Sequence, residues 1–378
     1  MTFFSRKVYA IVLSALLTAL SLAAGCSDSS SVYSDQDHAL EQALDQAYRE
    51  ADVPGMVARV VRPDGSTWTG TRGKAEMTTK AGNASPVQAT DSLNSRTRFR
   101  IGSVAKSFTA LLTLILAEEG YFDLDDRLAQ WFPDFWPKSD EISLRLLLNM
   151  RSGLPDYEEE ITQLMMEEPY RQWQPLEILN LVRDKPLVFE PNTGWIYCNT
   201  GYIILGIIAE QETGQFLPEL IRTKILEPLK MDATFLPEAN EITEPFVRGY
   251  QYFDNDYYQG WTDVTNWNPS GAGAAGNMIS TLHDLTIWLN ALQEGRLVRE
   301  ADHEAMFDFV STGLGFSYGY GIFDMGGAVG HNGFIFGYTT AIYRYEGYDF
   351  VVMTNGSPGL GIVPADSVFV RLKDAVFD

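Results

Sequence analysis

The clearest hydrophobic pattern in the chain follows the serine at position 103. The apolar residues Phe108, Leu111, Leu112 and Ile115 recur at the three- and four-residue spacing of a buried helix face. Gly120 comes just after this run and is typical of a helix end. The pattern therefore predicts a buried helix with Ser103 at its start, where the serine is held rigidly.

Strand patterns occur only towards the two ends of the sequence. Short apolar or alternating segments bounded by turn residues predict strands there, whereas the middle of the chain shows helical spacing. The predicted strands are 55–61, a second strand that follows the turn at 62–65 and runs through Trp68, 327–338, 339–345 and 350–354. The predicted helices are 38–51, 144–148, 176–182, 203–209, 282–292 and 364–377. The sequence therefore predicts strands towards both chain ends, with a mainly helical region between them.

The segment from Phe235 to Asn268 is long and unusually rich in tyrosine and tryptophan. Such a segment could line a substrate cleft, or it could pack over the core. The sequence leaves both possibilities open.

The N-terminal segment is typical of a secretory signal. Arg6 and Lys7 precede an apolar run, and Ala23-Ala24-Gly25 stand directly before Cys26. Small residues before a cysteine resemble the bacterial lipoprotein box, which predicts removal of residues 1–25, lipidation of Cys26 and a tether over residues 26–37. We expect anchoring to the membrane on the periplasmic side of the cell envelope. An ordinary signal peptide with an incidental cysteine is the alternative.

Composition narrows the possible partners. The 378 residues are 45% hydrophobic, which is enough for a large core, and the formal net charge is −22. This charge argues against nucleic acid or an anionic membrane surface as a partner. Cys198 is the only cysteine besides Cys26, so no intrachain disulfide is expected. No later segment is apolar and long enough to cross a membrane, so a lipid anchor is the only expected membrane contact.

Ser103 and Lys106 form the first candidate catalytic pair. Three residues are nearly one helical turn, so the lysine amine can approach the serine Oγ. A serine hydroxyl needs a neighbouring base to become a nucleophile, and a lysine can serve if desolvation or another cation lowers its pKa. The alternative is a helix-capping serine followed by a solvated lysine.

Two further short motifs add candidate residues. Tyr197 and Asn199 lie on a loop before a buried helix, where the phenol could relay a proton and the amide could bind substrate. His331 and Gly333 lie in a predicted strand, and a residue without Cβ allows another backbone to approach closely. Taken singly, each motif also fits a purely structural role: a packed tyrosine, a turn asparagine or a core histidine.

Together, Ser103-x-x-Lys106, Tyr197-x-Asn199 and His331-x-Gly333 resemble the serine β-lactamase and penicillin-binding-protein superfamily, with the closest likeness to class C β-lactamases, DD-carboxypeptidases and related esterases. The resemblance implies a five-stranded antiparallel sheet flanked by helices, with an inserted all-helical domain. We expect the α/β part at about residues 38–122 and 281–378, and the helical part at about 123–280.

The resemblance also implies roles for the motif residues. Ser103 would be the acylated nucleophile, Lys106 its base or relay, and Tyr197 the residue that exchanges a proton with the leaving group. Asn199 would hold the substrate amide, and the N–H groups of Ser103 and Phe334 would form the oxyanion hole. His331 stands where many β-lactamases carry lysine, and a protonated histidine there could hold a substrate carboxylate.

Three functions follow as hypotheses. The first is a D-alanyl-D-alanine carboxypeptidase-like hydrolase acting on cell-wall peptides, and the second is a β-lactamase or small-ester esterase with the same residues. The third is a penicillin-binding sensor that is acylated without turnover. All three take a small-molecule or peptide substrate, and neither a metal nor another cofactor is expected.

Overall fold

The computed structural model describes residues 29–77, 93–240 and 242–378. The predicted signal segment and the predicted lipidation site Cys26 lie outside these residues. Within the described ranges, no helix is both long and apolar enough to cross a membrane.

In the described part of the chain, the main sheet has eight strands in the order β2-β1-β12-β11-β10-β9-β8-β7, and every paired neighbour is antiparallel. Its first five members are the strands that the sequence predicts from both chain ends: β1 (Gly55–Val61), β2 (Thr67–Gly73), β10 (Ala328–Ile335), β11 (Tyr338–Tyr345) and β12 (Tyr348–Thr354). Three short strands extend the predicted five: β7 (Val310–Ser311), β8 (Ser317–Tyr318) and β9 (Phe323–Met325). Strands of two or three residues are too short to show an alternating pattern.

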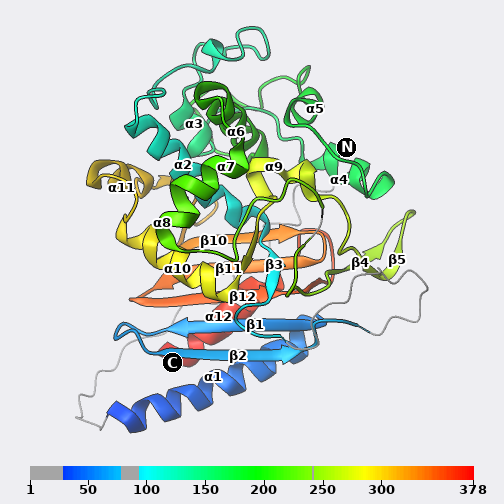
Figure 1. Ribbon diagram of the computed structural model, residues 1–378, viewed down its shortest axis with the longest axis vertical. Coiled ribbons are helices and arrows are strands. Elements are labelled where there is room, and N and C mark those ends of the chain that lie inside the picture. Colours follow the sequence, from blue (N-terminus) through cyan, green and yellow to red (C-terminus); the bar gives the residue numbers. More distant parts are fainter. Residues whose placement is uncertain (1–28, 78–92, 241) are drawn as a thin grey trace.

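Helices cover both faces of the sheet (Figure 1). The helices α1 (Ser29–Ala51) and α12 (Pro364–Phe377) pack on one face, where they bury a core that includes Leu44, Phe350 and Phe369. The helices α2 (Ala105–Glu118) and α10 (Leu282–Glu294) belong to the larger core, in which Phe108 stacks on Trp288 with ring centroids 3.7 Å apart. The long helix after Ser103 is therefore sandwiched between the sheet and the helical region, as its apolar spacing predicts.

The segment predicted as a tether differs in the structure. Helix α1 begins at Ser29, so residues 29–37 form its first turns. Arg62 holds this end of the helix, because it donates a hydrogen bond to Gln36 at 2.7 Å and forms an ion pair with Asp37. The sequence of the segment alone does not show this helix, because the contact with Arg62 comes from a distant part of the chain.

The central region is mainly but not wholly helical. Its helices are α3 (Leu144–Leu148), α4 (Glu158–Glu167), α5 (Pro175–Asn180), α6 (Asn199–Thr213), α7 (Leu217–Ile221), α8 (Glu227–Leu229) and α9 (Gly273–Gly276), and α11 (Glu300–Met306) follows α10. Short 3₁₀ or π turns occupy Gly102–Val104, Leu128–Gln130, Arg222–Leu226 and Pro269–Ala272. Two small sheets add β3 (Arg98–Arg100) paired with β6 (Ile279–Thr281), and the hairpin β4 (Tyr250–Asp254) and β5 (Gln259–Asp263), which continues to β13 (Gly356–Ser357).

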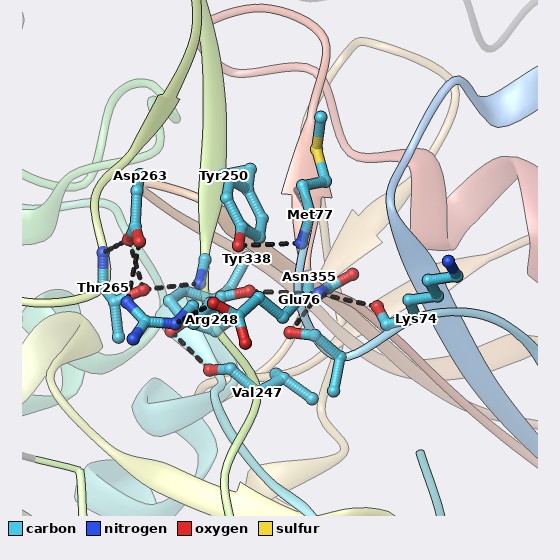
Figure 2. Close-up of polar contacts among 12 residues, drawn as sticks. Lys74, Glu76, Met77, Val247, Arg248, Tyr250, Asp263, Thr265, Tyr338 and Asn355 are labelled. Carbon is cyan, nitrogen blue, oxygen red and sulfur yellow. Dashed lines mark hydrogen bonds and ion pairs between the residues drawn. The ribbon is translucent and has the colours of Figure 1, made fainter. Parts of the chain in front are cut away.

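The β4–β5 hairpin departs from the predicted all-helical insertion, and polar contacts join it to the α/β part (Figure 2). Arg248 is buried and pairs with Asp263 at 2.9 Å and with Glu76 at 3.2 Å. Asn355 donates to the backbone carbonyls of Lys74 and Arg248. These contacts connect three distant segments of the chain at the base of the hairpin.

The aromatic segment 235–268 serves partly in packing. Trp267 lies 5.5 Å from Phe253 and 5.1 Å from Phe336 between ring centroids, and all three rings are buried. Tyr252 and Tyr257 remain exposed on the hairpin. For the buried rings, the alternative that this segment packs over the core is therefore confirmed.

Candidate active site

Ser103 lies in the 3₁₀ turn that leads into α2, directly beside strand β10. Two glycines allow this close approach. A Cβ atom on Gly333 would lie 2.0 Å from the carbonyl oxygen of Ile101 and 2.9 Å from the backbone nitrogen of Ser103. Gly102 has φ of +53°, and a Cβ there would lie 2.7 Å from the backbone nitrogen of Phe334. The N–H groups of Ser103 and Phe334 are therefore neighbours, as an oxyanion hole requires.

Lys106 reaches the nucleophile as the three-residue spacing predicts. Its Nζ donates to Ser103 Oγ at 3.0 Å and to the carbonyl oxygen of Ala275 at 2.8 Å. Ala275 belongs to α9, and the neighbouring carbonyl of Ala274 accepts from Thr109 at 2.7 Å. Contacts from helices α2 and α9 thus hold the Lys106 amine beside the Ser103 hydroxyl.

The surroundings of Lys106 suit it to act as a base. The side chain has 0% exposure, and this burial lowers its pKa to about 7, although the negative charges of Asp156 and Glu158 oppose the shift. Near neutral pH a large fraction of Lys106 is therefore uncharged and able to take the proton of Ser103.

Tyr197 lies against Lys106, with the lysine Nζ 4.9 Å from the centre of the phenol ring. Burial raises the pKa of Tyr197 well above its ordinary value, and the nearby Ser103 hydroxyl offsets only part of this effect. The phenol oxygen is buried and has no hydrogen-bond partner of good geometry among the described residues. A protonated phenol in this position can pass a proton onward, and such contacts often tighten only when substrate binds.

His331 is present at the site but cannot supply a positive charge. The side chain has 0% exposure, and burial together with the charge of Lys106 lowers its pKa to about 3. Its Nε2 pairs with the Tyr318 hydroxyl at 3.2 Å, and its Nδ1 pairs with the backbone carbonyl of Asn332. The expectation of a protonated histidine beside a substrate carboxylate is therefore not supported, because the ring is neutral near physiological pH.

Asn199 lies at the first turn of α6, and its amide faces two carboxylates. Its Nδ2 donates to Asp156 at 3.0 Å and to Glu158 at 3.4 Å, and its backbone N–H donates to Asp156 at 3.2 Å. Asp156 is partly buried and Glu158 is exposed. Direct contact of Asn199 with a substrate amide stays a prediction.

Asp156 and Glu158 are functional candidates that the sequence analysis did not single out. The surrounding protein and the negative charge of Glu158 raise the pKa of Asp156 to about 7. Desolvation by nearby protein atoms also raises the pKa of the Glu158 carboxyl, although the residue as a whole is exposed. Both carboxyls accept from Asn199, two residues after Tyr197, and their charges affect the pKa values of Lys106 and Tyr197, so they lie close to the site. Acidic residues at the start of a helix are common for reasons of stability, so their position in the sequence gave no functional signal.

The arrangement is that of a serine hydrolase site. It combines a nucleophilic hydroxyl, a buried amine at 3.0 Å, a phenol and two adjacent backbone N–H groups. Among the described residues, no group of three or more histidine, cysteine, aspartate or glutamate side chains is arranged to hold a metal ion. The roles named here need only the residues of the chain itself.

Comparison with known families agrees with this class. The family model described as Beta-lactamase matches residues 40–375, so the chain belongs to the β-lactamase family. Penicillin-binding protein 4* of Bacillus subtilis is 29% identical over 72% of this chain and 61% of its own length. A D-aminopeptidase of Brucella anthropi is 30% identical over 66% of this chain and 50% of its own length. The chain therefore spans about half to three fifths of these curated relatives.

Solved structures match over nearly their whole length. The D-amino acid amidase of Ochrobactrum anthropi SV3, solved with D-phenylalanine, has a TM-score of 0.76 and 28% identity over 90% of this chain and 99% of that chain. A D-stereospecific amidohydrolase from Streptomyces has a TM-score of 0.75 and 29% identity over 90% and 98%. The predicted fold class and the predicted assignment as a serine hydrolase are confirmed.

Proposed function

We propose that this protein hydrolyses amide bonds of D-amino acid substrates that carry a free ammonium group. The observation that carries the proposal is the carboxylate pair Asp156 and Glu158. Both carboxyls accept hydrogen bonds from Asn199 and act electrostatically on Lys106, and Glu158 as a residue is exposed to solvent. The raised pKa values leave the pair partly protonated near neutral pH, and its ionised form attracts an ammonium group and disfavours a substrate carboxylate.

The remaining charges of the site favour the same substrate class. His331 is neutral because burial lowers its pKa to about 3, and Lys106 has a pKa of about 7 and is directed at Ser103. Neither residue is therefore suited to hold a substrate carboxylate as a permanent cation. The net charge of −22 also favours the approach of cationic molecules.

The names of relatives support the proposal independently. A D-aminopeptidase, a D-amino acid amidase and a D-stereospecific amidohydrolase are each similar to this chain at 28–30% identity. Hydrolysis of a D-residue amide is the activity that these printed names share, and the carboxylate pair fits the free amine of such a residue.

The proposed reaction uses the residues as they lie. Ser103 Oγ attacks the amide carbonyl as its proton passes to the neutral amine of Lys106, and the N–H groups of Ser103 and Phe334 stabilise the oxyanion. Tyr197 delivers a proton to the leaving amine as the C–N bond breaks. Water then attacks the acyl-enzyme ester and gives a proton back to Tyr197, and Ser103 Oγ leaves with the proton held by Lys106 as the acid is released.

Glu158→Gln provides the test of substrate class, because it removes charge while keeping the shape of the side chain. Wild-type enzyme should hydrolyse D-phenylalanine p-nitroanilide faster than its N-acetyl derivative, and the variant should lose about 10-fold in kcat/KM on the free amine alone, as expected for one charge-assisted contact. Glu159→Gln, an exposed neighbour on α4, is the matched control and should leave both rates unchanged. Equal rates on both substrates in the wild type would contradict the proposal.

The second candidate is the D-alanyl-D-alanine carboxypeptidase predicted from the sequence. The similarity to a penicillin-binding protein favours it. A D-Ala-D-Ala peptide, a chromogenic cephalosporin and a p-nitrophenyl ester, compared by kcat/KM, distinguish it from the β-lactamase and esterase alternatives. Stable acylation without turnover on all of them would indicate the sensor alternative.

We also propose that Cys26 carries a lipid and anchors the protein to the envelope membrane. The small residues directly before Cys26 support this proposal. Cys26→Ser should move the protein from the membrane fraction to the soluble fraction, because acyl chains give the expected attachment. Wild-type protein that fractionates as soluble, with an unmodified N-terminus by mass spectrometry, would contradict it.

A further inference from the structure

Strand β10 is paired unevenly along its length. β11 pairs with residues 329–335, whereas β9 pairs only with Ala328, Val329 and Gly330 on the other edge. Beyond this point the open edge faces the 3₁₀ turn of Ser103, and it is this half of the strand that contains Gly333 and Phe334. The half of β10 that contains Gly333 and Phe334 is therefore paired with β11 alone, whereas the half from Ala328 to Gly330 also has β9 as a neighbour.

Asn332 lies in this half-paired segment and connects it to helix α12. Successive side chains of a strand point to opposite faces, so Asn332 points away from the face of His331 and Gly333. Its Nδ2 donates to the Oδ2 of Asp366 in the first turn of α12. The backbone carbonyl of the same asparagine accepts from His331 Nδ1, so Asn332 joins the helix to the site.

Asp366 is itself held in place from several directions. The Tyr343 hydroxyl donates to its Oδ1 at 3.4 Å, and its own N–H donates to the carbonyl of Val363 at 3.1 Å. The neighbouring N–H of Ala365 donates to Thr339 Oγ1 at 3.2 Å, which fixes the helix start to β11. Two side-chain donors and the helix N-terminus stabilise the carboxylate, although burial raises its pKa to about 7.

We propose that Asp366 is a positioning residue that, through Asn332, holds the half-paired segment of β10 at the distance from Ser103 that the oxyanion hole requires. The proposal rests on the acyl-enzyme chemistry of Ser103 and is independent of the ammonium substrate class. An oxyanion contact forms fully only in the transition state, so a displaced Phe334 N–H should lower kcat more than it raises KM.

Hydrolysis of p-nitrophenyl acetate by the full chain tests this role, because that ester has no ammonium group. Asp366→Ala and Asn332→Ala should each lower kcat about 10-fold or more with KM changed less than about 2-fold, since small displacements of catalytic groups are costly. The double variant should be no slower than the slower single variant, because both remove the same contact. Asp366→Asn retains an acceptor oxygen and should keep most of the activity.

Tyr343→Phe is the matched control, since it removes the other side-chain donor to Asp366 and leaves Asn332 in place. It should keep kcat close to that of the wild type. Normal kcat in both alanine variants with only a lower melting temperature would overturn the proposal, as would additive losses in the double variant. If Asp366→Ala does not fold, the kcat of folded Asn332→Ala decides whether the contact between Asn332 and Asp366 positions β10. Should the ester not turn over, the rate of Ser103 labelling by a fluorophosphonate replaces kcat.

Discussion

Ser103→Ala is expected to abolish covalent labelling by a fluorophosphonate and to lower hydrolysis by at least about three orders of magnitude. The substitution removes the only atom that can form the acyl-enzyme, whereas alanine is compatible with the short 3₁₀ turn that holds this residue. Intact-mass spectrometry after labelling, with the melting temperature measured in parallel, checks both parts of this expectation.

Ser107→Ala is the matched control for the nucleophile. Ser107 lies on α2, four residues after Ser103, and its hydroxyl accepts from Trp288 and donates to the carbonyl of Val104. Its loss should lower stability by about 1 kcal/mol or more without preventing the labelling of Ser103. An adduct found on Ser103→Ala at the wild-type rate would assign the chemistry to another residue.

Lys106→Met is expected to slow acylation of Ser103 by about 10³-fold, the largest predicted effect after that of Ser103→Ala. Methionine fills most of the buried space of the lysine, but it cannot accept the proton of Ser103 at the 3.0 Å position of Nζ. The rate of adduct formation under single-turnover conditions measures the loss. Lys138→Met, at an exposed lysine paired with Glu190, should leave that rate unchanged.

The pH profile gives a signature of Lys106 that is independent of any packing effect. Because its pKa lies at about 7, the lysine is protonated below that pH and neutral above it. Acylation of the wild type should therefore rise as the pH increases through about 7 and then level off. The rise should be absent in the residual activity of Lys106→Met, and a rise of the same midpoint in that variant would assign the titration to a different group.

The sequence predicted the nucleophile and its base because their relation is local. Three residues along a helix fix the direction of Lys106 towards Ser103 whatever the rest of the fold does. The five long strands and the closing helix were predicted for a similar reason, since their periodicity is visible in a short window. The strands β7, β8 and β9 were missed because they are only two or three residues long.

Features set by distant contacts could not be predicted in the same way. The state of His331 depends on Tyr318 and Lys106, which come from other segments and bury the ring or oppose its charge. Asp156 and Glu158 become a pair in the site only because Asn199 lies against both. The hairpin β4–β5 depends on β13, to which β4 pairs in parallel near the end of the chain.

The arrangement of the sheet also governs when this chain can become reactive. Ser103 lies in the first third of the sequence, whereas β10, which completes the oxyanion hole, is supported by β11 and β12 from the last part. β1, made early, has β12 as its inner neighbour. A ribosome delivers the chain from its N-terminus, so Ser103 is synthesised before the strands that complete its oxyanion hole. A chain that ends before β10 therefore lacks the Phe334 N–H, one of the two backbone groups of that hole.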